Sequence, residues 1–370
     1  MARAPTALKV RSDAQLSRDD SASLSARVAK DIVEDLFAPN PAIYWVDLIV
    51  TIIITYSCIA VFLTELAGLA GSITTFAISV IGLFRIGTFM HEIVHFRKNS
   101  MRLFKLGWNV LAGIPLLMPS LLYTSHSDHH SNRYYGTPAD GEYLPFAVTP
   151  VGEILRFFVI VPLLAPAAVL RFFLVVPVSL LHPVARRLVL ERFSAAAINP
   201  YYRRRNPPAP WDLYWLVTDI VCFVYVATIV WLVSGEVIPL SVIAKLYVLI
   251  TCAHLLNWFR TLAAHRYRNH GGELSHADQV LDSINIVGQP WLNELLFPVG
   301  LRYHALHHLL PSLPYHSLGK AHQRLMRELP DDSRYRLTAC NDIYKALQQL
   351  WRDARANSRS EVMQAWRRVA

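Results

Sequence analysis

The sequence has few cysteines and few charged residues for its length. Four cysteines occur among 370 residues, and no two of them form a CxxC pattern. Neither a disulfide-stabilised scaffold nor a cysteine-bound iron–sulfur cluster is therefore indicated. Charged residues make up 17% of the chain and hydrophobic residues 53%, whereas soluble domains carry about 25% charged residues. This balance is typical of a membrane protein.

Several other patterns are missing. Residues 1–45 contain no apolar run of the kind found in a cleavable secretion signal. The net charge is +9, yet no zinc-finger, basic-zipper or RNA-recognition pattern accompanies it. The basic balance therefore does not indicate a nucleic-acid partner, and the topology of a membrane chain explains it better.

Four segments are long and apolar enough to span a bilayer, which requires about 20 residues. We expect them at residues 46–66, 69–90, 211–233 and 237–258. Very short turns join the first to the second and the third to the fourth. The sequence therefore predicts an all-α integral membrane protein with four transmembrane helices in two hairpins.

Lysine and arginine are absent from both hairpin turns. Six of the 36 precede the first span, 13 lie in residues 91–210 and 15 in residues 258–370. The positive-inside rule then places both termini and the long middle segment in the cytoplasm, at the inner or plasma membrane if the protein is bacterial. We expect a cytoplasmic N-terminal segment (1–45), a membrane domain (46–330) and a cytoplasmic helical tail (331–370).

Histidine is abundant, and its placement is ordered. Among the 15 histidines, His91 and His95 follow the second expected span, and His265 follows the fourth. HxxHH patterns occupy residues 126–130 and 304–308. Helical residues at i, i+3 and i+4 share a face, so each set projects together. Eight imidazoles, or nine with His265, are too many for one metal ion and suit two, with positions left for oxygen or water.

Two further apolar stretches are interrupted by prolines. They cover residues 107–123 and 151–181. If either stretch crossed the bilayer once, the histidine clusters would be divided between the two sides of the membrane. We therefore expect both to form half-buried or interfacial helices, although the second could also cross and return.

Other interpretations of the histidines stay open. His91, Glu92 and His95 match the HExxH helix of zinc proteases, in which the glutamate is the general base. A non-catalytic metal transporter is a further class, but it would place its ligands along a membrane path rather than beside the spans. His270 could be a ligand or only a neighbour of one, and His254, inside an expected span, is expected to be packed rather than ligating.

The three histidine boxes, their order and the paired spans resemble the integral membrane fatty acid desaturase superfamily, which also includes hydroxylases and ketolases. The resemblance covers about residues 45–330, and residues 300–316 are especially similar to the third box and its flank. It implies two irons held on the cytoplasmic side under a helical cap. The implied ligands are His91, His95, His126, His129, His130, His265, His304, His307 and His308.

One position departs from the family. In its acyl-CoA branch, an asparagine four residues before the single histidine holds a metal-bound water, and Thr261 stands there in this chain. That detail is therefore in doubt. Ligating histidines also need partners on their other ring nitrogen. Carboxylates close to the boxes in sequence are the candidates: Asp128, Glu142, Asp278 and Asp282.

The resemblance implies an O2-dependent oxidoreductase that introduces a double bond into a lipid acyl chain. Removing hydrogen from an unactivated carbon requires a redox metal, while the protein supplies orientation and a dry site. The sequence shows no fused electron-transfer domain, so an external donor is expected, such as a ferredoxin or a cytochrome-type protein. The alternative within the superfamily is a hydroxylase of a lipid or a terpenoid, and a zinc intramembrane protease is more remote.

Overall fold

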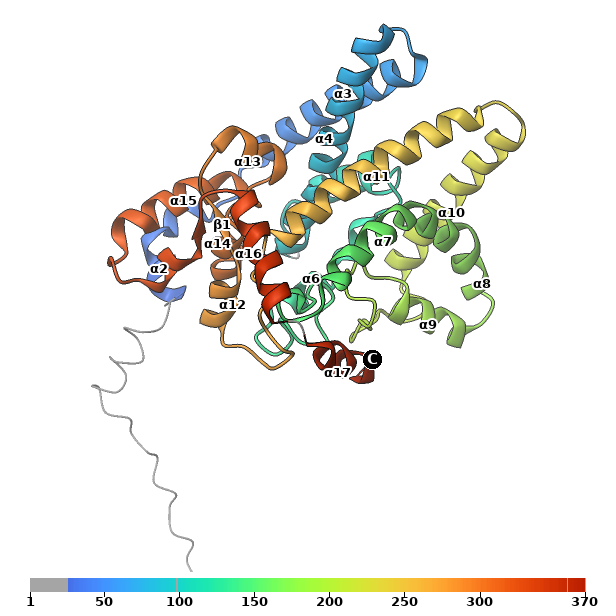
Figure 1. Cartoon of the computed structure of the whole chain (residues 1–370). Helices are drawn as coiled ribbons and strands as arrows, with labels where there is room; N and C mark the ends of the chain where they lie inside the picture. Colours follow the sequence, from blue (N-terminus) through green and yellow to red (C-terminus); the bar gives the residue numbers. More distant parts are fainter. Residues whose placement is uncertain (1–25, 98, 358, 370) are drawn as a thin grey trace, which may run out of the picture.

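The computed structural model describes residues 26–97, 99–357 and 359–369, and this part of the chain is almost entirely helical (Figure 1). Its extended structure is limited to a two-residue parallel pairing of β1 (Asn285–Ile286) with β2 (Ala339–Cys340) and isolated bridges. The predicted all-α class is confirmed. Of the expected N-terminal segment, residues 1–25 lie outside the described part.

The first hairpin consists of α3 (Pro41–Thr64) and α4 (Gly68–His95). The Asn40 side chain accepts a hydrogen bond from the Ala42 amide and so caps α3, as expected for an asparagine at this position. Helix α4 continues five residues beyond the predicted end of the second span. The extension carries the first histidine pair on the last turns of a membrane helix, which fixes the direction in which both rings project.

The second hairpin consists of α10 (Leu213–Ser234) and α11 (Leu240–Leu262). The two helices diverge from their connecting loop, so that their other ends lie apart (Figure 1). Lys245 near the start of α11 forms an ion pair with Glu65 in the turn of the first hairpin. This contact places the turn of the first hairpin beside the second turn of α11.

A further helical run fills the gap between the open ends of the second hairpin. It comprises α7 (Val151–Leu170), η5 (Arg171–Val175) and α8 (Val176–Ser179). The run is also long and apolar enough to cross a membrane, so the described part has five such helices rather than the four predicted. Length and composition alone therefore do not distinguish this run from the four expected spans.

Contacts at both ends of this run show where it lies. Near its start, Phe157 stacks on Trp258 close to the end of α11, with ring centroids 4.3 Å apart. Further along, Arg171 donates to Asp219 on the second turn of α10 at 3.0 Å. The run thus joins the two diverging ends of the second hairpin. Between these contacts, the Pro162 carbonyl accepts a hydrogen bond at 3.1 Å from Tyr247, which lies nearer the loop-side start of α11.

The other proline-interrupted stretch is broken into short pieces. It contains the end of α5 (Arg102–Trp108), then η2 (Asn109–Gly113) and η3 (Ser120–Tyr123). The Trp108 indole donates to the Ile86 carbonyl of α4 at 2.9 Å, which holds the stretch against that helix. Its pieces are too short to span a bilayer.

The remaining helices form a cap at the ends of α4 and α11 (Figure 1). They are α2 (Ala26–Ile32), η1 (Glu34–Leu36), α6 (His126–His129), η4 (Phe146–Val148), α9 (Pro183–Arg192), α12 (His276–Asp282), α13 (Pro290–Leu296), α14 (His304–Leu309), α15 (Tyr315–Glu328), η6 (Arg334–Thr338), α16 (Ile343–Ala356) and α17 (Ser360–Val369). Leu350 and Trp366 of the expected tail share a buried cluster with Trp258 of α11. The boundary at residue 330 stays a prediction.

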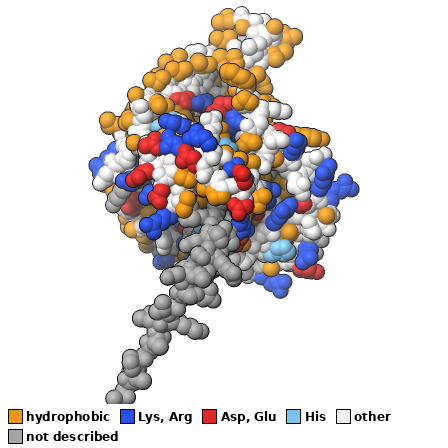
Figure 2. Space-filling model, turned by 90° about the vertical axis from the view of Figure 1, so that its left-hand side faces the viewer, with side chains coloured by type: hydrophobic (Ala, Val, Ile, Leu, Met, Phe, Trp, Pro, Cys, Tyr) orange, Lys and Arg blue, Asp and Glu red, His pale blue; other side chains and the backbone are white. Residues whose placement is uncertain are grey.

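The surface follows the same division. Figure 2 shows hydrophobic side chains covering the protruding hairpin end, while lysine, arginine, aspartate and glutamate gather on the cap. Ile53, Trp231 and Leu240 are among the large apolar side chains exposed on the hairpins. Such a surface is stable only in contact with lipid, so the fold is that of an integral membrane protein.

A buried cluster of charged side chains connects the run from α7 to α8, and also α9, to α10. Asp219 accepts hydrogen bonds from Arg171 at 3.0 Å and from Arg186 at 2.7 Å, and both Asp219 and Arg186 are fully buried. Removing one partner from a buried charge pair is costly because the other charge stays in a medium of low polarity. The neighbouring Arg187 instead forms an exposed pair with Glu191.

We expect Arg186→Met to lower the stability of the detergent-solubilised protein by about 3 kcal/mol, since Asp219 keeps only Arg171 as a partner. Arg187→Met is the matched control and should cost less than about 1 kcal/mol, because exposed pairs contribute little. Thermal unfolding of the two variants measures the difference. Equal melting temperatures would contradict the assigned role of Arg186.

Candidate metal centre

Eight of the nine predicted ligands form two groups of four. Within each group, one ligand atom from every histidine lies within 4.8 Å of those of the others. The first group is His91, His95, His126 and His307, and the second is His129, His265, His304 and His308. The rings come from α4, α6, α14 and the segment after α11, so the cap and the membrane helices build the site together.

Each HxxHH box serves both groups. In α14, His304 and His308 belong to the second group, while His307 faces the first. In the other box, His126 belongs to the first group and His129 to the second. Residues four apart on a helix are displaced by about 40° and residues three apart by about 60° in the opposite direction, which allows one short helix to supply two adjacent sites.

The ninth predicted ligand, His130, adjoins the first group. Its Nε2 lies 2.9 Å from Nε2 of His126 and 3.1 Å from Nε2 of His307. Its ring also stacks on His308 of the second group, with centroids 4.4 Å apart. His130 therefore lies between the two groups. His270, which the sequence left undecided, is exposed and belongs to neither.

Hydrogen bonds on the Nδ1 side orient several of these rings. His126 Nδ1 lies 2.6 Å from Glu142, His129 Nδ1 lies 2.8 Å from Asp140, and His265 Nδ1 lies 2.8 Å from the Tyr135 hydroxyl. An imidazole that donates from Nδ1 presents the lone pair of Nε2 on its other side. These are the tautomers that a metal ion bound at Nε2 requires.

The opposite nitrogens face one another at short range. Nε2 of His91 lies 2.8 Å from Nε2 of His307, and the same atoms of His265 and His304 are 2.9 Å apart. Both nitrogens of His308 are buried with no hydrogen-bond partner in the described part of the chain. In the tautomers that carry the proton on Nδ1, neither Nε2 atom of such a pair has a proton to donate to the other. A cation at the centre of each group would satisfy these buried nitrogen atoms.

Burial also selects the charge state of the rings. It lowers the pKa of His126, His130, His265, His304, His307 and His308, and neighbouring histidines lower it further. Neutral imidazole is the form that binds metal. His129 differs, because burial disfavours its protonation but the Asp140 carboxylate outweighs this and raises its pKa. Burial raises the pKa of Glu142 to about 7.

Two of the four carboxylates that we expected beside the histidine boxes contact a ligating ring directly or through one hydroxyl, and two do not. Glu142 contacts His126, and Asp282 accepts from Tyr135 at 2.9 Å and so reaches His265 through one hydroxyl. Asp128 instead accepts from Tyr202, and Asp278 bonds Ser275. Sequence reasoning missed Asp140, which lies 11 residues beyond its histidine. Only a search of the whole segment between the second box and α7 for carboxylates could have found it.

Glu92, the possible protease base, is hydrogen-bonded to residues outside the histidine groups. It accepts hydrogen bonds from the Tyr44 hydroxyl at 2.6 Å and from the Tyr315 amide at 3.1 Å. These contacts join α4 to α3 and α15. The carboxylate therefore helps to dock the cap onto the first hairpin.

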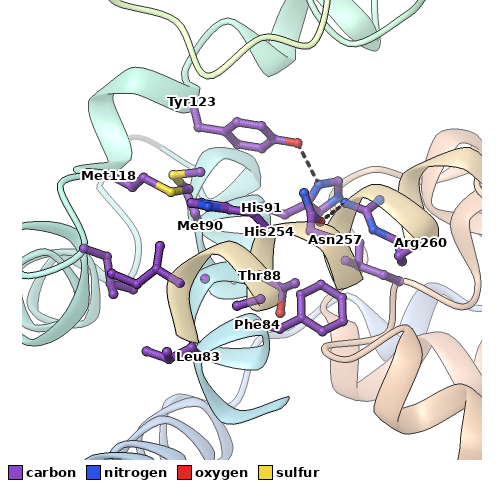
Figure 3. Close-up of a pocket in the computed structure, with 15 residues that line it drawn as sticks. Leu83, Phe84, Thr88, Met90, His91, Met118, Tyr123, His254, Asn257 and Arg260 are labelled. Carbon is purple, nitrogen blue, oxygen red and sulfur yellow. Dashed lines mark hydrogen bonds between the residues drawn. The ribbon is translucent and has the colours of Figure 1, made fainter. Parts of the chain in front are cut away.

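Two connected cavities lead into the membrane region from the histidines. One, of about 100 Å3, lies between α4 and α11 and is lined by apolar side chains such as Leu83 and Phe84 (Figure 3). The other, of about 360 Å3, lies between α11 and α7 and reaches His129, His265 and His304. His91 lines both. An apolar space that ends on a cluster of imidazoles suits a hydrocarbon chain.

Comparison with known proteins agrees with this geometry. The sequence model of the family described as "Fatty acid desaturase" matches residues 66–339. This chain belongs to the fatty acid desaturase family. It is also 37% identical over 332 residues to a ceramide hydroxylase of Caulobacter vibrioides (strain NA1000 / CB15N), covering 89% of this chain and 93% of that protein. No solved structure matches it significantly.

Membership in the desaturase family confirms the predicted resemblance and the class of membrane oxidoreductase. It does not decide between desaturation and hydroxylation, because the similar protein from Caulobacter is named a hydroxylase. The metal and the ligand roles of the nine histidines stay predictions, supported by the two groups of four.

We expect protein purified without oxygen to contain two irons per chain by elemental analysis. His307→Ala removes a member of the first group and His265→Ala a member of the second, so each should lower the iron content to one or less. The exposed His270→Ala is the control and should retain both irons. One zinc per chain, unchanged in the two cluster variants, would overturn the assignment.

The role of Asp140 is tested by a matched pair of aspartates. Asp140→Asn should weaken metal binding by about 10- to 100-fold, because the amide cannot hold His129 as the carboxylate does. Asp128→Asn changes a carboxylate that accepts from Tyr202 and contacts no histidine ring among the described hydrogen bonds, so this variant should bind metal nearly as the unaltered protein does. Competition with a chelator, followed by the loss of bound iron, measures both.

Proposed function

We propose that this protein is a membrane diiron oxygenase that hydroxylates the hydrocarbon part of a ceramide or a similar N-acyl lipid. The observation that carries the proposal is the apolar cavity that ends on both groups of histidines. The substrate class and the type of reaction are supported by 37% identity, over nearly the whole chain, to a ceramide hydroxylase.

The proposed reaction balances with one equivalent of oxygen and two electrons. One C–H bond of the lipid becomes C–OH, the second oxygen atom leaves as water, and two protons are consumed. Two irons held by the nine histidines would supply the activation of O2 that no side chain can provide. The apolar walls exclude bulk water, and Asp140, Glu142 and Tyr135 accept hydrogen bonds from Nδ1 of the ligating rings and so hold them in position.

The proposed topology keeps both hairpins in the membrane and the cap in the cytoplasm. The distribution of lysine and arginine supports this orientation. The run from α7 to α8 would have both ends on the cytoplasmic side of the bilayer, since Phe157 and Arg171 contact the cap-side parts of α11 and α10. Between them, Pro162 contacts Tyr247 farther along α11. Four spans, rather than five, would then cross.

Electrons must reach the site from another protein. We propose an acidic donor of the ferredoxin or cytochrome type, because the cap that covers the histidines carries many of the chain's lysines and arginines (Figure 2). Opposite charges accelerate the encounter of such partners and align them.

Desaturation is the second candidate, and the family description favours it. It uses the same site and the same two electrons, but two adjacent C–H bonds are lost and both oxygen atoms leave as water. In hydroxylation one oxygen atom stays on the carbon, whereas in desaturation a second hydrogen atom is removed and no oxygen stays on the lipid. Which of the two occurs would depend on how the acyl chain lies against the metals.

Expression in a host that makes ceramide, under 18O2, separates the candidates by mass spectrometry. We expect a ceramide product heavier by one 18O atom, absent with His304→Ala. A product lighter by two hydrogens, without label, would assign desaturation instead. If neither appears with a competent electron donor, while fatty acids or other lipids are oxidised, the ceramide assignment is wrong.

A further inference from the structure

The wall that α11 contributes to the cavities is polar, although its surroundings are apolar. His254, Asn257 and Arg260 follow one another at intervals of three residues and line both cavities (Figure 3). Residues three apart share a helix face, and the set extends along about 9 Å of the helix. We call these three residues the polar stripe.

Two buried nitrogen atoms of the polar stripe have no hydrogen-bond partner among the described residues. Arg260 donates to the Asn257 side-chain oxygen at 2.9 Å, but its Nε atom has no partner. Nδ1 of His254 is likewise buried without a partner in the described part of the chain. Arg260 is near Glu142 but forms no ion pair with it or with another described carboxylate at contact distance, and the two Glu142 oxygens accept from Tyr123 and contact His126.

Unpaired polar atoms in an apolar cavity are costly unless a ligand satisfies them. The two unpaired atoms can both donate: Nε of the Arg260 guanidinium and, in one tautomer, Nδ1 of His254. A hydrocarbon chain offers them nothing. An oxygen acceptor, such as the carbonyl of an amide or a hydroxyl group, matches them.

We propose that the polar stripe binds an oxygen-bearing group of the lipid, and thereby places a carbon only a few bonds from that group at the metal centre. The inference rests on the proposed function, which supplies an N-acyl lipid as substrate. The larger cavity contains the stripe together with His129, His265 and His304, so the bound group and the reacting carbon share one space. Arg260 is in this sense a residue that determines specificity.

Binding is measured directly, with the full-length protein in nanodiscs, for a ceramide, the corresponding free fatty acid and an alkane of equal chain length. Arg260→Met keeps the length of the side chain and removes its donors. We expect it to weaken ceramide binding by about 10- to 100-fold, as for the loss of a hydrogen bond to a charged group, and to leave alkane binding unchanged. Arg260→Lys should recover part of the affinity.

The control is Thr251→Val on the same helix. Its hydroxyl is buried without a partner but does not line either cavity, so ceramide binding should not change. If the free fatty acid depends on Arg260 more strongly than ceramide does, the acceptor is a carboxylate rather than an amide or a hydroxyl. Ceramide affinity within twofold of the unaltered protein in Arg260→Met, or an equal loss for the alkane, would overturn the proposal.

The position of the product gives a second, independent readout. Mass spectrometry should locate the new hydroxyl close to the amide in the unaltered protein and spread over several carbons in Arg260→Met. Oxidation of ceramide with unchanged binding and position in the variant would reject the stripe and retain the proposed function. Binding that depends on Arg260, without any product, would retain the stripe and reject the proposed function.

Discussion

A hydrogen bond at one nitrogen of a histidine ring fixes the direction in which the other nitrogen points. In this protein such hydrogen bonds join three of the predicted ligands to the loops of the cap. Asp140 reaches His129, Glu142 reaches His126, and Tyr135 with Asp282 behind it reaches His265. Asp140 is itself fixed by the backbone amides of Gly136 and Glu142, at 2.9 and 2.8 Å. These hydrogen bonds therefore connect the conformation of residues 136–142 to the orientation of the histidine rings.

Local patterns in the sequence were sufficient for the hairpins and for the histidine boxes. Apolar length located α3, α4, α10 and α11, and the spacing of His304, His307 and His308 predicted that they share a helix. The division of each box between two groups could not be predicted, because it depends on how α14 meets α4 and α6. Closeness in sequence suggested Glu142 but not Asp140 in the same loop, because only the fold of the loop decides which carboxylate meets which ring.

The run from α7 to α8 shows a different limit. Its composition is that of a transmembrane helix, and length alone counts it as a fifth span. The partners near its two ends, Trp258 for Phe157 and Asp219 for Arg171, lie on the cap side of α11 and α10. Between them, the Pro162 carbonyl accepts from Tyr247 in the part of α11 nearer its loop. A helix that lies within the membrane without crossing it and a helix that crosses it can both have this composition. Hydropathy cannot separate these cases, because both are in contact with lipid.

Each box divides its histidines between both groups, and this has a consequence for how the centre is assembled. The first group needs His91 from the first hairpin and His307 from a helix more than 200 residues later in the chain. No stretch of the chain that ends before α14 contains all four histidines of either group. The predicted ions would therefore find a complete set of ligands only after α14 has docked against α4 and α6.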